Sequence, residues 1–180
     1  MATKQIATNQ QKDAKQMTTK QIAVERFSVV SAKPFDAVVA ALDAAIGHPD
    51  MGAFQKSIAS VNSQAEVGKI VGHAVGLSGL MEFTRFDLGA ILKKGRARKG
   101  PRILRIVAGN PLIMKEMVKH VPDAGSYAPV TILIDERPDG VHLSYDTMAS
   151  FLAPYGSAEA LKVARDLDLK VEALLRSAAA

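Results

Sequence analysis

The clearest pattern of apolar and polar positions lies between Gly109 and Tyr127. Asn110 and Pro111 favour the start of a helix, because asparagine accepts a free backbone N–H and proline has no N–H to satisfy. The apolar residues that follow recur at helical spacing and predict one buried face, formed by Ile113, Met114, Met117, Val118 and Val121. Pro122 ends this helix, and a glycine-bearing loop leads to an apolar strand at Val130.

Alternating and helical patterns predict the elements before this unit. A strand is expected over Gln21–Val30, and a helix opened by Ser31–Pro34 buries Phe35, Val38, Val39, Leu42 and Ile46. Phe54, Ile58 and Val61 predict a short helix, and the Ser63–Glu66 capping box starts another that runs towards Gly76. The remaining expected elements are a strand over Gly79–Phe86, a short helix over Leu88–Leu92 capped by Asp87, and a strand over Ile103–Ala108.

The segment after Val130 predicts a hairpin and a long helix. Val130–Glu136 and Val141–Tyr145 read as strands joined across Pro138-Asp139-Gly140, and Thr147–Leu152 reads as a helical turn. Ser157 caps a helix of about twenty residues. Leu161, Leu169 and Leu175 lie off its main apolar stripe, so the helix has either a broad side facing the core or a surface for a partner.

This order of elements predicts an α+β fold, with a mostly antiparallel sheet, helices packed on one face and a long C-terminal helix. Residues 1–20 are polar and aperiodic, so we expect a disordered N-terminal extension before a single domain over residues 21–180. The motif of Met1–Ala7 returns almost unchanged as Met17–Ala23. We interpret residues 1–16 as a duplicated extension; the alternative is coincidence in a tail rich in Lys, Gln and Thr.

Composition excludes several classes of site. The 180 residues contain no cysteine, which rules out disulfides, thiolate metal sites and a cysteine nucleophile. No apolar run approaches the ~18 residues that a membrane span needs, and the N-terminus lacks the apolar segment of a secretory signal. We therefore expect a cytoplasmic protein that does not contact a membrane.

The formal charge of +5 is local. Seven basic residues without an intervening acid lie between Lys93 and Arg105, and without them the chain has 16 basic and 18 acidic residues. This segment is either a patch that attracts anions or a solvated loop. It has no aromatic side chain on which bases could stack, which argues against nucleic acid as a partner.

The chain resembles the domain of unknown function 302 family at Gly109-Asn110-Pro111, at Pro122…Gly125 and Pro129, and at the strand Val141–Tyr145. The resemblance spans roughly residues 21–152. It implies a small α+β fold of the TATA-binding-protein-like type and a homodimer, and it implies no established activity. Many family members carry a cysteine after the proline that corresponds to Pro129. Val130 stands here, so thiol chemistry at that position cannot operate in this chain.

Candidate catalytic residues are few. The four histidines show no metal-ligand spacing with one another, so we predict no metal site unless the fold creates one. His120 lies one helical turn after Glu116, which indicates either an acid–base pair or a surface ion pair. A cofactor-free enzyme would use His120, Tyr127 and Asp146, with Tyr145 nearby, and the sequence identifies no cofactor.

The junction before the helix at Asn110 is the most plausible ligand site. Free amides at a helix N-terminus attract anions, and Arg102 and Arg105 lie on the strand that leads to it. We therefore predict that Arg102, Arg105 and Asn110 bind a small anionic molecule in a homodimeric protein. The alternatives are the cofactor-free enzyme and a purely structural dimeric interaction module.

Overall fold

The computed structural model describes residues 18–93 and 100–180, and in them five strands form one antiparallel sheet. The order across the sheet is β1-β5-β4-β3-β2, so the β4–β5 hairpin supplies the central strand β4 and one of its neighbours. The strands are β1 (Arg26–Ser31), β2 (Met81–Asp87), β3 (Ile103–Gly109), β4 (Val130–Arg137) and β5 (Gly140–Asp146). The predicted α+β fold with a mostly antiparallel sheet is confirmed.

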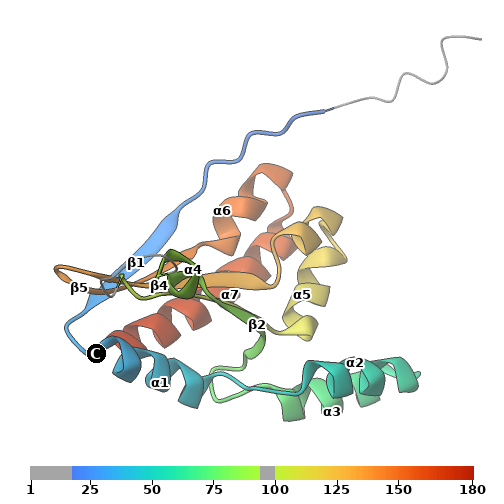
Figure 1. Ribbon diagram of the computed structural model, residues 1–180. Helices are drawn as coiled ribbons and strands as arrows, with labels where there is room; N and C mark the ends of the chain where they lie inside the picture. Colours follow the sequence, from blue (N-terminus) through green and yellow to red (C-terminus); the bar gives the residue numbers. More distant parts are fainter. Residues whose placement is uncertain (1–17, 94–99) are drawn as a thin grey trace, which may run out of the picture.

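Helices cover one face of this sheet (Figure 1). The long C-terminal helix α7 packs against α1, α5 and α6 and against the strands β1 and β5. No described helix has the length and apolarity needed to cross a membrane. The α-helices are α1 (Phe35–Ala45), α2 (Met51–Ser60), α3 (Gln64–Ala74), α4 (Leu88–Lys93), α5 (Pro111–Val118), α6 (Met148–Leu152) and α7 (Ala158–Ala179). Two 3-10 helices are η1 (Pro122–Ser126) and η2 (Ala153–Tyr155).

Alternation along the strands explains the single covered face. On β4, Ile132 and Ile134 are fully buried under the helices. Thr131 and Leu133, which alternate with them, are only partly buried on the opposite face. Successive side chains of a strand point to opposite sides of the sheet. Each strand therefore contributes apolar side chains to the covered face and a mixture of apolar and polar side chains to the other face. The face without helices is therefore free to form a site.

A buried carboxylate on α7 holds the helix layer to the end of β5. Asp168 accepts hydrogen bonds from the Tyr145 hydroxyl at 2.5 Å and from the backbone amides of Met148 and Ala149 at 2.7 and 2.9 Å. These amides begin α6 and have no partner within that helix. Asp168, which is 7% exposed, thus caps α6 from another helix.

The central unit forms as predicted at its start and differs at its end. The Asn110 side chain accepts from the Leu112 amide, and Met117 is fully buried. The helix ends at Val118, earlier than Pro122, because the residue before a proline disfavours helical geometry and Val121 is extended. The predicted loop that follows begins with the 3-10 helix η1.

Two further sequence predictions change in the structure. The strand predicted over Gln21–Val30 begins only at Arg26, because β5 ends at Asp146, which is the partner of Arg26 in the ladder. On α7, Leu175 is fully buried and belongs to the core, Leu161 is partly buried, and Leu169 is 67% exposed. Most of the extension predicted to be disordered (residues 1–20), all of the predicted duplication (residues 1–16) and most of the basic segment lie outside the described residues.

Gly47, which follows α1, and Gly76, which follows α3, allow two backbone segments to pass close to each other. A Cβ atom on Gly47 would meet the Ala74 carbonyl oxygen at 2.0 Å, and one on Gly76 would meet the Ala45 carbonyl oxygen at 2.5 Å. Both amides donate to the Leu80 carbonyl at 2.9 Å, directly before β2. The close contact therefore determines where β2 enters the sheet.

We predict that Gly76→Ala destabilises the protein by about 1–3 kcal/mol, because the methyl group forces two backbone segments apart. Gly72→Ala is the matched control, since its Cβ would meet no atom within 4 Å. As a helix-interior replacement it should stabilise by about 0.5–1 kcal/mol. Urea unfolding of the two variants measures the difference, and equal stabilities would contradict the assignment.

We predict that Asp168→Ala lowers the unfolding free energy by about 2–4 kcal/mol, because two backbone amides and a buried hydroxyl lose a charged acceptor. Asp166→Ala, on the exposed side of the same helix, serves as the control and should change it by less than about 0.5 kcal/mol. Chemical denaturation followed by circular dichroism compares them. A loss no larger than that of the control would show that the cap is dispensable.

Candidate functional site

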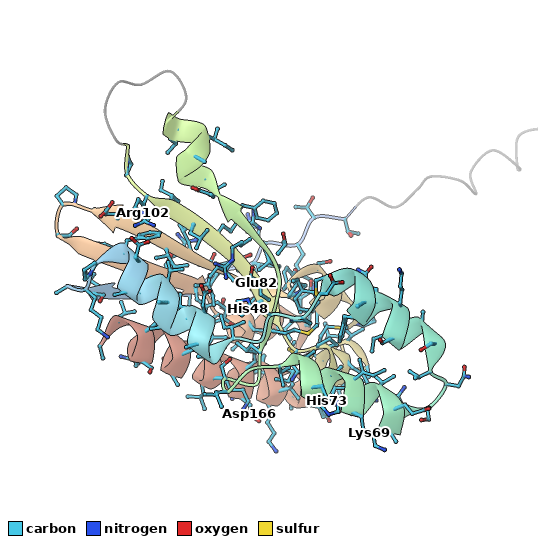
Figure 2. All side chains as sticks on the ribbon, turned by 60° about the horizontal axis from the view of Figure 1, so that its bottom comes forward. His48, Lys69, His73, Glu82, Arg102 and Asp166 are labelled. Atoms are coloured by element: carbon cyan, nitrogen blue, oxygen red, sulfur yellow. The ribbon has the colours of Figure 1, made fainter. Side chains whose placement is uncertain are left out.

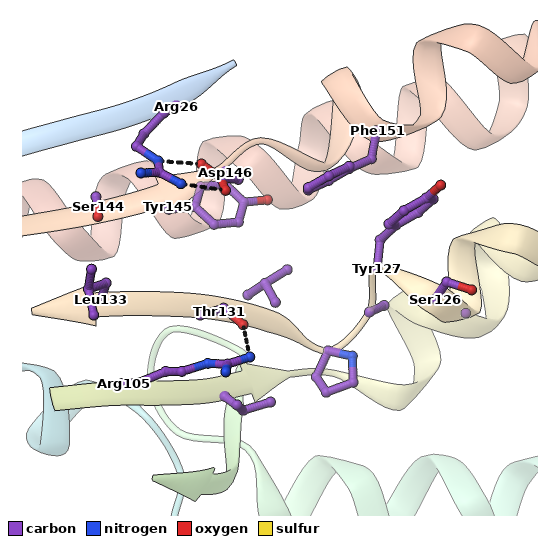
Figure 3. A pocket seen from close by; sticks show the side chains of 15 residues that line it. Arg26, Arg105, Ser126, Tyr127, Thr131, Leu133, Ser144, Tyr145, Asp146 and Phe151 are labelled. Atoms are coloured by element: carbon purple, nitrogen blue, oxygen red, sulfur yellow. Dashed lines mark hydrogen bonds and ion pairs between the residues drawn. The ribbon is translucent and has the colours of Figure 1, made fainter. Parts of the chain in front are cut away.

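A cavity of about 600 Å³ lies on the open face of the sheet, at the end where β3 and β5 finish and β4 begins (Figure 3). Its floor is made by side chains of the strands, chiefly Arg105, Val107, Thr131, Leu133 and Ser144. Its wall is the segment 125–130 together with Phe151 of α6. This volume is in the range of small-molecule sites, which is ~300–1,000 Å³.

The floor follows from the strand registers. Arg105 lies opposite Leu133, and Leu133 lies opposite Ser144, so the three side chains form a row across the open face. Two residues further along β4, Thr131 is paired with Val107 of β3. Because the pairing is antiparallel and in register, residues far apart in the sequence meet here.

Two arginines and one carboxylate supply the charge of the cavity. Arg26 donates two hydrogen bonds to Asp146, at 2.6 and 2.8 Å, and these bonds raise the pKa of the Arg26 guanidinium. Arg105 donates to the Thr131 hydroxyl at 3.4 Å and makes no ion pair with any described carboxylate. With Asp146 matched by Arg26, one positive charge in the lining is left without a counter-charge.

An aromatic pair forms the wall beyond this charge. The rings of Tyr127 and Phe151 stack at 4.7 Å between centroids. The Tyr127 hydroxyl points away from the floor and lies 2.9 Å from the hydroxyl of Tyr155 (Figure 3). That hydrogen bond, together with desolvation, raises the pKa of Tyr155 to about 12. Tyr127 therefore offers the cavity a ring rather than a hydroxyl.

Tyr145 touches the cavity, but its hydroxyl belongs to the core. The hydroxyl donates to Asp168 and accepts from the Met148 amide at 3.0 Å. Burial, reinforced by the neighbouring Asp168 carboxylate, raises the pKa of Tyr145. The group is held in the protonated form and is not available for acid–base chemistry on this face.

The three residues predicted to bind a ligand together do not converge. Arg102 precedes β3, forms an ion pair with Asp36 and lies over the ring of Phe35, 4.3 Å from its centroid. Asn110 follows the other end of β3, roughly 25 Å away at ~3.3 Å per residue. Its side chain is occupied by the Leu112 amide and the Gly79 carbonyl. Of the three, Arg105 alone lines the cavity.

The predicted catalytic residues are also divided. Tyr127 and Asp146 line the same cavity, whereas His120 lies after the end of α5, is exposed and does not line it. Glu116 pairs with Lys119 instead of His120, and this ion pair is the main cause of its lowered pKa. Among the described residues, Glu116 and His120 form neither a hydrogen bond nor an ion pair, although the charge of His120 contributes to the lowered pKa of Glu116.

The fold creates one cluster with potential metal ligands that the histidine spacing did not indicate. Side-chain ligand atoms of Asp43, His48 and Glu82 lie within 4.8 Å of one another, and Figure 2 shows His48 beside Glu82. Arg85 donates to Asp43 at 2.6 Å and to Glu82 at 2.7 Å, and its pKa is raised, first by the bond to Glu82. A cation would have to displace this guanidinium, so we interpret the cluster as a link between α1 and β2.

Several residues of the cavity were missed by the sequence reasoning, namely Arg26, Thr131, Ser144 and Phe151. The signal that could have found two of them is the hairpin. Once Val130–Glu136 is a strand with its even positions buried and Val141–Tyr145 one with its odd positions buried, Thr131 and Ser144 must share the other face. Arg26 could not be found this way, because the partner of β1 is not adjacent in the sequence.

Comparison with known proteins identifies the fold. A crystal structure of an uncharacterized conserved protein DUF302 from Bacillus stearothermophilus superimposes with a TM-score of 0.58 at 8% identity. The superposition covers 85% of this chain and 97% of that one. At this identity the likeness concerns the fold alone. A search of curated proteins finds no sequence match.

The sequence profile described as "Domain of unknown function DUF302" matches residues 56–178. This region begins within α2 and includes most of α7, which the resemblance over residues 21–152 had left outside. More than half of the chain is matched, and the matched part holds β2 to β5 and most of the cavity lining. The chain belongs to the DUF302 family.

Proposed function

We propose that this protein binds a small organic anion in the cavity on the open face of the sheet, with Arg105 as its charged contact. The observation that carries the proposal is the guanidinium group of Arg105, which lies in a cavity without a carboxylate partner among the described residues. A guanidinium presents a planar set of N–H donors that matches a carboxylate or phosphate.

Four other arginines differ from Arg105 in having an acidic partner. Arg26, Arg85, Arg102 and Arg137 each form an ion pair with an aspartate or glutamate. Arg105 contacts only the hydroxyl of Thr131, at 3.4 Å, and the ring of Phe86, 5.8 Å from its centroid. A bound anion would supply the missing counter-charge and would be sheltered by the wall of the cavity.

The lining indicates the chemical class of the anion. Val107, Leu133, Pro129 and the aromatic wall are apolar, whereas the hydroxyls of Thr131, Ser144 and Ser126 offer further hydrogen bonds. An inorganic ion would leave the apolar walls uncovered. A carboxylate or phosphate ester with a compact apolar portion suits both parts of the site.

Binding is favoured over catalysis because each candidate acid or base is already engaged. Asp146 is held by Arg26, the Tyr127 hydroxyl by Tyr155, and the Tyr145 hydroxyl by Asp168. His120, the remaining member of the predicted set, does not line the cavity. The arrangement can attract and orient a charged group, and it holds no free proton acceptor beside Arg105.

We predict that anions stabilise the protein through Arg105. Benzoate, acetate, phosphate and sulfate are titrated in a thermal-shift measurement. At 100 times the dissociation constant, a bound anion should stabilise by about 2.7 kcal/mol. For a chain of this size that corresponds to a rise in Tm of about 5–10 °C. Arg105→Ala should abolish this rise and change the unliganded stability by less than about 0.5 kcal/mol, because the side chain is exposed.

Arg165→Ala is the matched control. It removes the same charge from an exposed position of α7, outside the cavity, and should keep the full anion response. If Arg105→Ala and Arg165→Ala respond alike, the effect is general electrostatics and the proposed site is wrong. If no anion shifts the unmutated protein, the proposal fails outright.

We also propose that the protein forms a homodimer, as the sequence resemblance implied. Of the three leucines that suggested it, Leu175 is fully buried and Leu161 partly buried, while Leu169 is exposed. Val30 and Phe86 are each about half exposed on the open sheet face and offer apolar surface instead. Static light scattering should give twice the 19.2 kDa of the chain at micromolar concentration, and a single-chain mass would contradict the prediction.

A further inference from the structure

A second cavity, of about 240 Å³, lies at the N-terminal end of α5. It is enclosed by side chains from β2, α5 and α7 and by the segment 128–130, which also borders the cavity of Arg105. The residues that shape it are Phe83, Pro111, Met114, Met117, Pro129 and Leu167. Unlike the first cavity, it has no charged side chain in its lining.

Both polar atoms of the one polar side chain among its lining residues are hydrogen-bonded to the backbone. The Oδ1 atom of Asn110 accepts from the Leu112 amide and the Nδ2 atom donates to the Gly79 carbonyl, each at 2.9 Å. A buried water molecule needs about two to four polar partners, and the lining side chains offer only the remaining hydrogen-bonding capacity of Asn110. The cavity therefore favours an apolar occupant over water.

The missing side chain of Gly109 helps to keep the cavity open. A Cβ atom at this position would lie 3.2 Å from the Cβ atom of Pro129 and 3.5 Å from the ring of Phe83. Met114 and Phe83 are only partly buried, so the cavity has an opening to the surface beside them, whereas Met117 is fully buried at its inner end. A ligand could enter past the flexible thioether of Met114.

We propose that this cavity is a binding site for an uncharged apolar group, either a single aromatic ring or a short branched hydrocarbon. An apolar cavity of ~150 Å³ is known to accept benzene, so 240 Å³ is sufficient for a substituted ring. Two thioethers and a phenyl ring form favourable contacts with an aromatic ligand. A charged group is excluded, because its burial would have no compensating partner.

This site is separate from the proposed anion site. Arg105 does not line it, and Met114 and Met117 do not line the cavity of Arg105. Binding here therefore does not depend on whether the first cavity takes an anion. The two sites share only the segment 128–130 as a common wall.

The methionines provide the test. Protein labelled with ¹³C at the methionine methyl groups is titrated with toluene, and the signals are assigned by Met→Leu variants. The methyl signals of Met114 and Met117 should shift and saturate together, whereas those of Met51 and Met148, which do not line the cavity, should stay in place. Arg105→Ala should leave the toluene affinity unchanged, which separates this site from the anion site.

Met114→Trp fills the cavity from its partly exposed mouth and should weaken toluene binding at least about tenfold, as reported by Met117. If this variant does not fold, the titration of the unmutated protein still decides the matter. The proposal is overturned if Met114 and Met117 do not respond up to the solubility limit of toluene. A uniform shift of all methionine signals overturns it as well, since that is the signature of non-specific partitioning.

Discussion

The capping of α6 by Asp168 is the interaction on which the arrangement of layers depends. It places a carboxylate of α7 against two free backbone amides at the end of β5, and it adds the Tyr145 hydroxyl from the sheet itself. An ionised acceptor satisfies the donors at a helix N-terminus better than a neutral one. Sheet, short helix and long helix are thereby joined at one point, and α6 carries Phe151 to the wall of the cavity.

Within the described parts of the chain, the helices pack on one face of the sheet and the other face stays open. The apolar residues that alternate inward are enclosed by α1, α5 and α7, while the outward set is a mixture of charged, hydroxyl and apolar side chains. A sheet of this kind can use its outer face for recognition without loss of core packing. The Arg105 cavity lies on this outer face, and the residues of its floor are not part of the hydrophobic core.

The segment 128–130 separates two environments of opposite character. On one side lie two guanidinium groups, a carboxylate and several hydroxyls; on the other lie thioethers, a phenyl ring and two prolines. Val130 takes part in both the ladder and the core, and Pro129 packs on Gly109. A short stretch of chain that connects η1 to β4 thus forms the boundary between a site suited to charge and a site suited to hydrocarbon.

Several local elements of this protein are predictable from its amino-acid sequence. The Ser63–Glu66 capping box, the Asn110–Pro111 helix start and the Ser157 cap all lie where the residues predict them. These signals are readable because each depends on groups within a few residues of one another. The α+β class and the burial of Met117 follow from apolar periodicity for the same reason.

Which residues share a site is visible only in the folded chain. Arg26 and Asp146 are hydrogen-bonded although they are 120 residues apart in the sequence, and Arg85 and Asp43 are hydrogen-bonded across 42 residues. Asp168, a polar residue on the buried side of α7, accepts a hydrogen bond from Tyr145. Arg102 and Arg105 are three residues apart in the sequence but do not share a site. Arg102 precedes β3 and pairs with Asp36, whereas Arg105 lies on the open face of the sheet. Such pairings depend on strand order and helix packing, which are properties of the whole chain and leave no local mark in the sequence.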